Sequence, residues 1–204
     1  MSAGHQPKSH LSYGVTAPAS QTNFPLANLS IDNEMRLNLV VDCYLGQVAG
    51  TPSLKLQDST GYSFWNDVKA TTLSASTDKT ATVSGTTWTS ASHGFTNGQM
   101  VVVNSTGNLP GGYLPGMRCF VEGATTDTFA LTPSNSTRSA PIAATDSGTG
   151  TLTVTAVTLV TLRLNVNVAG DQSVMPMRPM GRMVTTTGGS DTVQLMDVRT
   201  GYTY

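Results

Sequence analysis

Residues 93–153 read HGFTNGQMVVVNSTGNLPGGYLPGMRCFVEGATTDTFALTPSNSTRSAPIAATDSGTGTLT. Glycine, proline and asparagine interrupt this stretch at short intervals, and between them stand short runs rich in β-branched and aromatic residues. Such runs, bounded by turn residues, are typical of β-strands, and residues 128–132 also alternate polar and apolar side chains. Strands are expected over 99–103, 118–122, 128–132 and 151–157. The stretch therefore predicts a small all-β module.

Four motifs punctuate this module. They are H-G-F-x-x-G-x-x-V-x-V from His93, N-L-P-G-G from Asn108, T-T-D-T-F-A-L-T from Thr125 and D-S-G-T-G-T from Asp146. Their order resembles a small β repeat of bacteriophage tail and virion proteins, which is similar to the first-catalytic-cysteine-half β fold of ubiquitin-activating enzymes. The resemblance covers about a third of the chain and implies a virion structural protein without ubiquitin chemistry. The Gly-Gly-Tyr run at 111–113 departs from the simpler polar loop of related repeats.

The composition is typical of a β protein with a neutral, hydroxyl-rich surface. Charged residues make up 11% of the 204 residues, and the formal net charge is −1. Threonine, serine, asparagine, glutamine and glycine are therefore expected to cover the surface, where threonine suits a half-exposed strand. Without a cationic excess to neutralise phosphates, the chain is not expected to bind nucleic acid. The arginines of the last third are instead expected to pair with nearby aspartates. The arginines are Arg163, Arg178, Arg182 and Arg199, and the aspartates are Asp171, Asp191 and Asp197.

The two cysteines, Cys43 and Cys119, each lie in an apolar strand. They are expected to be buried free thiols, which fits assembly in the reducing cytoplasm of a host bacterium. Residues 1–10 are polar, so no signal peptide is expected. The longest apolar runs are far shorter than a membrane span, and no membrane association is expected.

The rest of the chain reads as a second β body. Residues 35–44 alternate apolar and polar side chains with a period of two, as a half-buried strand does. The run at 151–168 is rich in β-branched residues and fits either one long bent strand or two strands. The predicted fold is all-β: a discontinuous β-sandwich or barrel body, an inserted small β-barrel-like module and an extended N-terminal arm. The boundaries are 1–28 for the arm, 29–75 plus 151–204 for the body and 76–150 for the module.

Two segments are candidates for contacts with other subunits. Residues 1–28 are predicted to be an irregular arm, because prolines break any regular element there, and such a polar segment gains order by binding a partner. Residues 174–183 alternate methionine and arginine around two prolines, which predicts an edge or a loop. This segment fits packing between body and module and a subunit contact equally well. The candidate contact residues are Tyr13, Phe24, Leu26, Met175, Met177, Arg178, Met180 and Arg182.

No catalytic constellation stands out. His5 and His10 lack the further ligands that a metal site needs, and His93 is expected to cap a turn. Neither a nucleophile elbow nor a Walker loop is present, and Glu34 and Glu122 are the only glutamates, so no carboxylate pair is marked. The sequence therefore predicts no enzyme, no cofactor and no metal.

Three functions follow. The first is a non-enzymatic virion protein, a head decoration or cement protein that binds the major capsid protein or other virion subunits and stabilises the shell. A homo-oligomer is expected, and a trimer by analogy with decoration proteins. The second is a neck, tail or fibre-associated subunit. The third, from another class, is a carbohydrate-binding adhesin with exposed aromatic side chains as a stacking platform. Its candidates are Trp88, Tyr113 and the Tyr62–Trp65 cluster.

Overall fold

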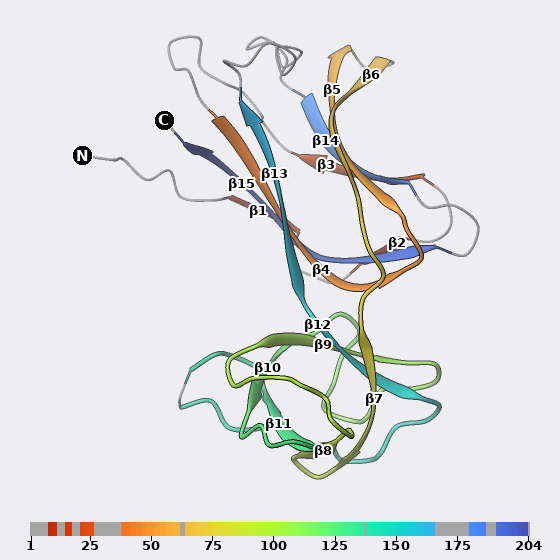
Figure 1. The fold of residues 1–204 in the computed structure, drawn as a ribbon, viewed down its shortest axis with the longest axis vertical. Helices are drawn as coiled ribbons and strands as arrows, with labels where there is room; N and C mark the ends of the chain where they lie inside the picture. The colour runs from red at the N-terminus through yellow and green to blue at the C-terminus, as the bar shows by residue number, and fades with distance from the viewer. Residues whose placement is uncertain are drawn as a thin grey trace. The chain divides into compact units, whose positions relative to one another are not determined.

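The computed structural model of this chain describes residues 8–11, 15–17, 21–26, 38–61, 64–136, 138–165, 180–186 and 191–203. These residues form fifteen β-strands and no helix, so the predicted all-β class is confirmed. Among them, no helix could cross a membrane. The chain divides into two compact units, which are shown in Figure 1. The body spans Met1–Ser12, Thr16–Ala75 and Leu159–Tyr204, and the second unit spans Tyr13–Val15 and Ser76–Thr158.

The second unit is a closed barrel of antiparallel strands in the order β10-β11-β8-β7-β12-β9 (Figure 1). Its strands are β7 (Asp78–Ser84), β8 (Thr87–Thr89), β9 (Met100–Ser105), β10 (Arg118–Glu122), β11 (Thr128–Thr132) and β12 (Leu152–Ala156). The barrel closes where β10 pairs with β9, with Cys119 opposite Val101. Closure pairs every strand on both sides and leaves no open edge.

The barrel core follows from alternation along each strand. In β10, Cys119 and Val121 are buried while their neighbours are partly or fully exposed. In β11, Phe129 and Leu131 take the same inward positions. Apolar residues at every second position therefore fill one interior, and each fully buried large side chain contributes about 1.5–3 kcal/mol.

The second unit ends at Thr158, whereas the predicted boundary of the inserted module is residue 150. The run 151–168 begins with two strands, β12 and β13 (Thr158–Asn165). Strand β12 pairs with both β7 and β9 and therefore completes the barrel. Thr155 of β12 is fully buried and donates its hydroxyl hydrogen to the Oδ1 atom of Asp78 at 2.7 Å, which fastens the first and last strands together. The strand expected over 151–157 is therefore present as β12 of the barrel, whereas the predicted boundary at residue 150 assigned these residues to the body.

The body contains two sheets. One has the order β1-β15-β4-β13, with β2 also paired to β15, and the other has the order β3-β14-β5-β6. The strands are β1 (Lys8–Leu11), β2 (Val15–Ala17), β3 (Gln21–Leu26), β4 (Asn38–Ala49), β5 (Ser53–Gly61), β6 (Phe64–Thr72), β14 (Met180–Thr186) and β15 (Thr192–Thr203). Val41, Cys43 and Leu45 of β4 are buried, as the predicted alternation requires. Leu54 and Leu56 bury the corresponding face of β5.

The predicted arm contains regular structure, so the expectation that its prolines exclude strands was wrong. Strand β1 pairs with β15, and β3 pairs with β14 along its whole length, with Phe24 opposite Met183. Pro25 lies within β3. The strand tolerates this proline because it is an edge strand with a single neighbour, so one row of its N–H groups is not needed for the sheet.

The second candidate segment also differs from its prediction. Residues 180–183 belong to β14, which lies between β3 and β5 and is therefore a central strand, not an edge or a loop. Both prolines of the segment, Pro176 and Pro179, precede the first residue of β14, so they remove no hydrogen-bond donor from it. Residues 174–179 lie outside the described residues.

Candidate functional site

A hydrogen bond joins the side chains of Trp88 and Tyr113 in the apolar core of the barrel. The indole N–H of Trp88 donates a hydrogen bond to the phenol oxygen of Tyr113 at 2.9 Å, and the two rings meet edge to face with centroids 5.3 Å apart. The Tyr113 hydroxyl in turn donates to the carbonyl oxygen of Ile142 at 3.3 Å. Trp88 is 0% exposed and Tyr113 is 5% exposed. Neither ring can serve as the exposed stacking platform that the adhesin hypothesis assigned to it.

Burial also fixes the ionisation state of Tyr113. Removal from water raises the pKa of the phenol to about 12, although the hydrogen bond from Trp88 favours the ionised form. The proximity of Cys119 adds to the rise. The phenol is therefore neutral at physiological pH, and its hydroxyl remains a donor to Ile142.

His93 joins this core, although it was expected only to cap a turn. The cap is present, because the backbone N–H of Phe95 donates to the Nδ1 atom of His93 at 2.9 Å. The imidazole is 2% exposed and packs against the ring of Phe129 with centroids 4.8 Å apart. Its Nε2 atom is buried and has no hydrogen-bond partner among the described residues. Since Nδ1 accepts, the ring hydrogen is assigned to Nε2.

Two loops of the barrel that are far apart in sequence lie side by side. The backbone N–H of Thr149 donates to the carbonyl oxygen of Asn108 at 3.0 Å, and the N–H of Asn108 donates to the Thr149 hydroxyl at 2.8 Å. The Ser105 hydroxyl donates to the carbonyl oxygen of Thr149 at 2.6 Å. Further along, the carboxylate of Asp146 accepts from the N–H of Gly111 at 3.2 Å. These bonds join the N-L-P-G-G motif to the D-S-G-T-G-T motif.

Glycine is required where these loops touch. Gly148 has a φ of 67°, and a Cβ atom there would lie 2.6 Å from the carbonyl oxygen of Asn108. Gly150 has a φ of 76°, and its Cβ would lie 2.6 Å from the backbone nitrogen of Gly107. A side chain would be strained by the backbone conformation and blocked by the facing backbone.

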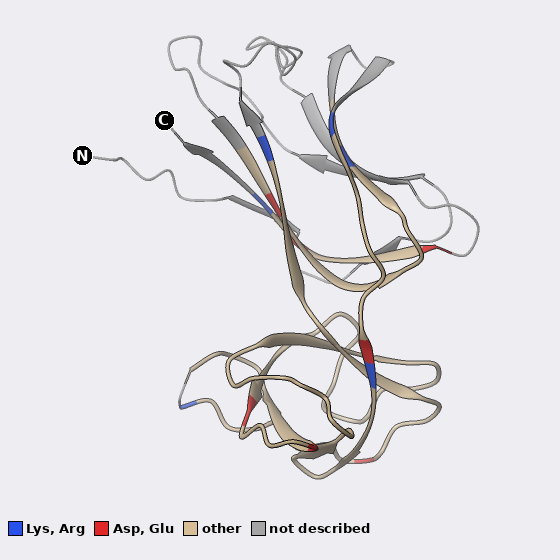
Figure 2. Cartoon of the chain, viewed as in Figure 1, with Lys and Arg blue, Asp and Glu red and all other residues tan. Residues whose placement is uncertain are grey.

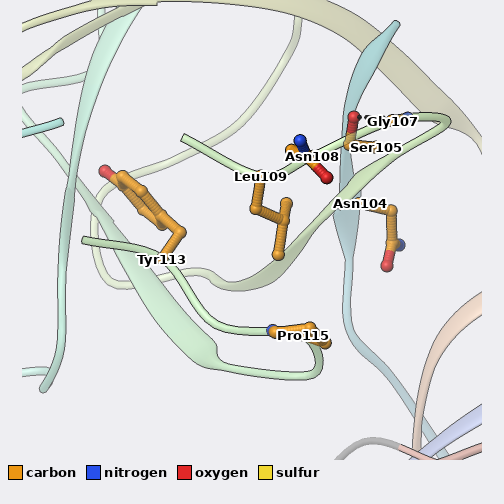
Figure 3. A pocket seen from close by; sticks show the side chains of 7 residues that line it. All are labelled: Asn104, Ser105, Gly107, Asn108, Leu109, Tyr113 and Pro115. Carbon is orange, nitrogen blue, oxygen red and sulfur yellow. Dashed lines mark hydrogen bonds between the residues drawn. The ribbon is translucent and has the colours of Figure 1, made fainter. Parts of the chain in front are cut away.

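Beside the joined loops the barrel has a hollow of about 370 Å³, shown in Figure 3. Amide, hydroxyl and apolar side chains line it, and none of the described lining residues is charged. The lining residues are Asn104, Ser105, Gly107, Asn108, Leu109, Tyr113 and Pro115. We call this the asparagine hollow. No sequence pattern predicts this hollow, because its two asparagines do not differ in pattern from the other asparagines of the chain.

A second, smaller hollow of about 210 Å³ lies elsewhere on the barrel. Its lining includes Asn97, Val121, Glu122, Thr132 and Asn135. The side chain of Asn97 is already used, because its Oδ1 atom accepts from the N–H of Ala124 at 2.8 Å. The described residues contain no group of three or more His, Cys, Asp or Glu side chains that could hold a metal ion.

Charged residues are sparse along the described part of the chain (Figure 2). Those of the barrel are Asp78, Lys79, Arg118, Glu122, Asp127, Arg138 and Asp146. In the body, the predicted pairing of the C-terminal arginines is observed at Arg199, whose Nε atom donates to the carboxylate of the buried Asp197 at 2.8 Å. This hydrogen bond raises the pKa of Arg199. The Arg199 guanidinium also lies 4.9 Å from the ring centroid of Tyr44.

For Asp191 the structure shows a backbone partner, and its pairing with an arginine stays a prediction. Its carboxylate accepts from the backbone N–H of Thr51 at 3.4 Å. Arg178 and Asp171 lie outside the described residues, as does the side chain of Arg182.

Both cysteines are buried and free, as predicted. Burial raises the pKa of Cys119 to about 12, and burial together with the charge of Asp42 raises the pKa of Cys43 to about 12. The thiols therefore stay protonated near neutral pH, and a protonated thiol is a poor nucleophile and metal ligand.

The candidate contact residues fall into two groups. Tyr13, Met175, Met177 and Arg178 lie outside the described residues. Phe24 and Leu26 lie on β3, and Met180 and Arg182 lie on β14. These two strands are neighbours in register, with Leu26 opposite Gly181. The backbone thus brings the two candidate segments together within one chain, and their contact with another subunit stays a prediction.

No known protein family, curated protein or solved structure matches this chain.

Proposed function

We propose that this chain is a non-enzymatic structural subunit of a bacteriophage particle. It binds the major capsid protein and stabilises the head shell as a decoration protein. The observation that carries the proposal is the pairing of the loops that contain Asn108 and Thr149. These loops hold two of the motifs that resemble the phage repeat, and the motif glycines serve the close approach of the two backbones. The resemblance therefore rests on residues that build the barrel framework.

The architecture suits a protein that acts by adding contact area. The chain leaves the body after β6 and returns as β13, each of which is the last strand of its sheet. An insertion between edge strands leaves the hydrogen bonding of both sheets intact. The neutral, hydroxyl-rich surface can be dehydrated in a contact at lower cost than a charged one. Small contacts repeated over a symmetric shell then add up.

The experiment is a measurement of copy number in purified particles of the phage that encodes this chain. Densitometry compares the amount of this chain with that of the major shell protein, after a high-salt wash that removes loosely bound protein. Copies comparable with the shell protein support decoration. A few copies per particle would instead support the neck, tail or fibre alternative, and absence from washed particles would refute the virion proposal.

A further inference from the structure

We infer that the asparagine hollow of the barrel binds a neutral saccharide unit. The hollow measures about 370 Å³, within the range of about 300–1,000 Å³ that is usual for small-molecule sites. This inference goes beyond the proposed function, because it assigns the barrel a ligand of its own. It also places saccharide binding away from the buried ring of Trp88, which a ligand cannot reach.

The lining favours a ligand that carries many hydroxyl groups and no charge. The side chain of Asn108 contributes an amide that can donate to one hydroxyl of a sugar ring and accept from a neighbouring one, and Asn104 adds a second amide to the lining. Leu109 and Pro115 provide apolar surface for the C–H face of such a ring, and the Tyr113 hydroxyl points away from them (Figure 3). A sugar ring presents the same combination of hydroxyl edges and apolar faces.

The same lining disfavours three other ligand classes. A carboxylate or phosphate would lose hydration without gaining a cationic partner, because none of the described lining residues is charged. An apolar ligand would take the side-chain amide of Asn108 out of water without offering it a hydrogen bond. An extended peptide binds by adding a strand to a sheet edge, and the closed barrel offers none.

The walls of the hollow are held rigidly. Asn108 is fixed through its backbone, which exchanges hydrogen bonds with Thr149, and no hydrogen bond among the described residues uses its side-chain amide. Ser105 is fixed by Thr149 and by the N–H of Gly107, which donates to the Ser105 hydroxyl at 3.0 Å. Tyr113 is fixed by Trp88. A site that is already in its binding geometry loses little conformational entropy when the ligand enters.

The test is an NMR titration of the full-length protein labelled with nitrogen-15. The probes are the methyl glycosides of glucose, galactose, mannose and N-acetylglucosamine, added to tens of millimolar, and glucuronate is the charged counterpart. At least one neutral glycoside is expected to shift the side-chain amide signals of Asn104 and Asn108 in a saturable manner. Glucuronate is expected to shift them less.

Two substitutions, each in a different wall of the asparagine hollow, test whether the glycoside binds in this hollow. Asn108→Ala keeps the backbone bonds to Thr149 and is expected to weaken binding about tenfold. Pro115→Ala changes an exposed residue on the apolar side of the hollow and is also expected to weaken glycoside binding. This variant tests the inference if Asn108→Ala does not fold. Asn135→Ala, in the second hollow, is the matched control and should bind as the unaltered protein does.

The inference is overturned if no neutral glycoside shifts these signals, if glucuronate binds as tightly, or if the folded variants bind as the unaltered protein does. Because binding is measured on the free protein, its outcome does not depend on whether the chain belongs to a phage particle.

Discussion

The indole N–H of Trp88 and the phenol oxygen of Tyr113 are 2.9 Å apart in the interior of the barrel, where both side chains are almost completely buried. Trp88 stands on β8, whereas Tyr113 stands in the loop between β9 and β10. This hydrogen bond therefore anchors a long loop to the core and positions one wall of the asparagine hollow.

Replacement of Tyr113 by phenylalanine is expected to destabilise the barrel by about 1–3 kcal/mol, because the indole N–H would stay buried without an acceptor. Urea unfolding followed by tryptophan fluorescence measures this, in a Trp65→Phe background so that Trp88 alone reports. Trp88→Phe removes the hydrogen-bond donor, so Tyr113→Phe should lower the free energy of unfolding by less in the Trp88→Phe variant than in the unaltered protein. Because that variant lacks Trp88, its unfolding is followed by circular dichroism. Equal stability of Tyr113→Phe and its parent would show that the hydrogen bond contributes nothing.

Stability is expected to fall at alkaline pH because the fold holds Cys119 as a thiol. Its pKa is raised by burial from 9.0 to about 12. A group whose pKa is higher in the folded state than in the unfolded state stabilises the folded state fully at pH values below its unfolded pKa. For Cys119, this contribution is lost as the pH rises from about 9 towards 12. In that window the thiol alone lowers the free energy of unfolding by about 1.4 kcal/mol per pH unit.

The control for this pH dependence is Cys119→Ala. The variant should be less stable than the unaltered protein at pH 7, since a buried side chain is truncated, but its stability should decline less steeply above pH 9. An identical slope in both proteins would exclude Cys119 as a source of the alkaline loss.

The barrel strands could be predicted from sequence because their signals are local. Turn glycines bracket β-branched runs, and the strands expected at 118–122 and 128–132 are present with those bounds. The pairing of Asn108 with Thr149 could not be predicted, since it joins residues 41 positions apart in sequence and depends on how the barrel closes. Asn108, which makes this pairing, also lines the asparagine hollow, so the hollow could not be predicted either.

Other predictions were wrong or incomplete because they relied on neighbouring residues in the sequence, whereas the outcome depends on where the residue lies in the folded sheets. A proline argues against a strand, yet Pro25 is accommodated because β3 lies at a sheet edge. Single-sequence patterns do not reveal which strand will be an edge. His93 was recognised as a turn cap, but its burial against Phe129 depends on a strand more than thirty residues away in sequence.

Gly148→Ala is expected to destabilise the barrel more than Gly85→Ala does. Both glycines have positive φ values, 67° and 58°, so both substitutions strain the backbone by about 1–2 kcal/mol. Only at Gly148 would the new Cβ also meet facing backbone, 2.6 Å from the Asn108 oxygen, whereas nothing lies within 4 Å at Gly85. Overpacking adds about 1–3 kcal/mol. Urea unfolding of the two variants measures the difference, and equal losses would mean that the loops separate without cost.

Deletion of residues 1–27 is expected to destabilise the body, because the predicted arm contributes strands to both of its sheets. The deletion removes β1, β2 and β3 and leaves β14 and β15 without their outer neighbours. Unpaired strand edges lose hydrogen bonds and template aggregation. We expect the Tm to fall by at least about 5 °C and light scattering to detect association. Deletion of residues 1–7, which precede β1, is the control and should change neither quantity. If the longer deletion changed neither the Tm nor the association state, the arm strands would contribute nothing to the body and would be free to bind another subunit.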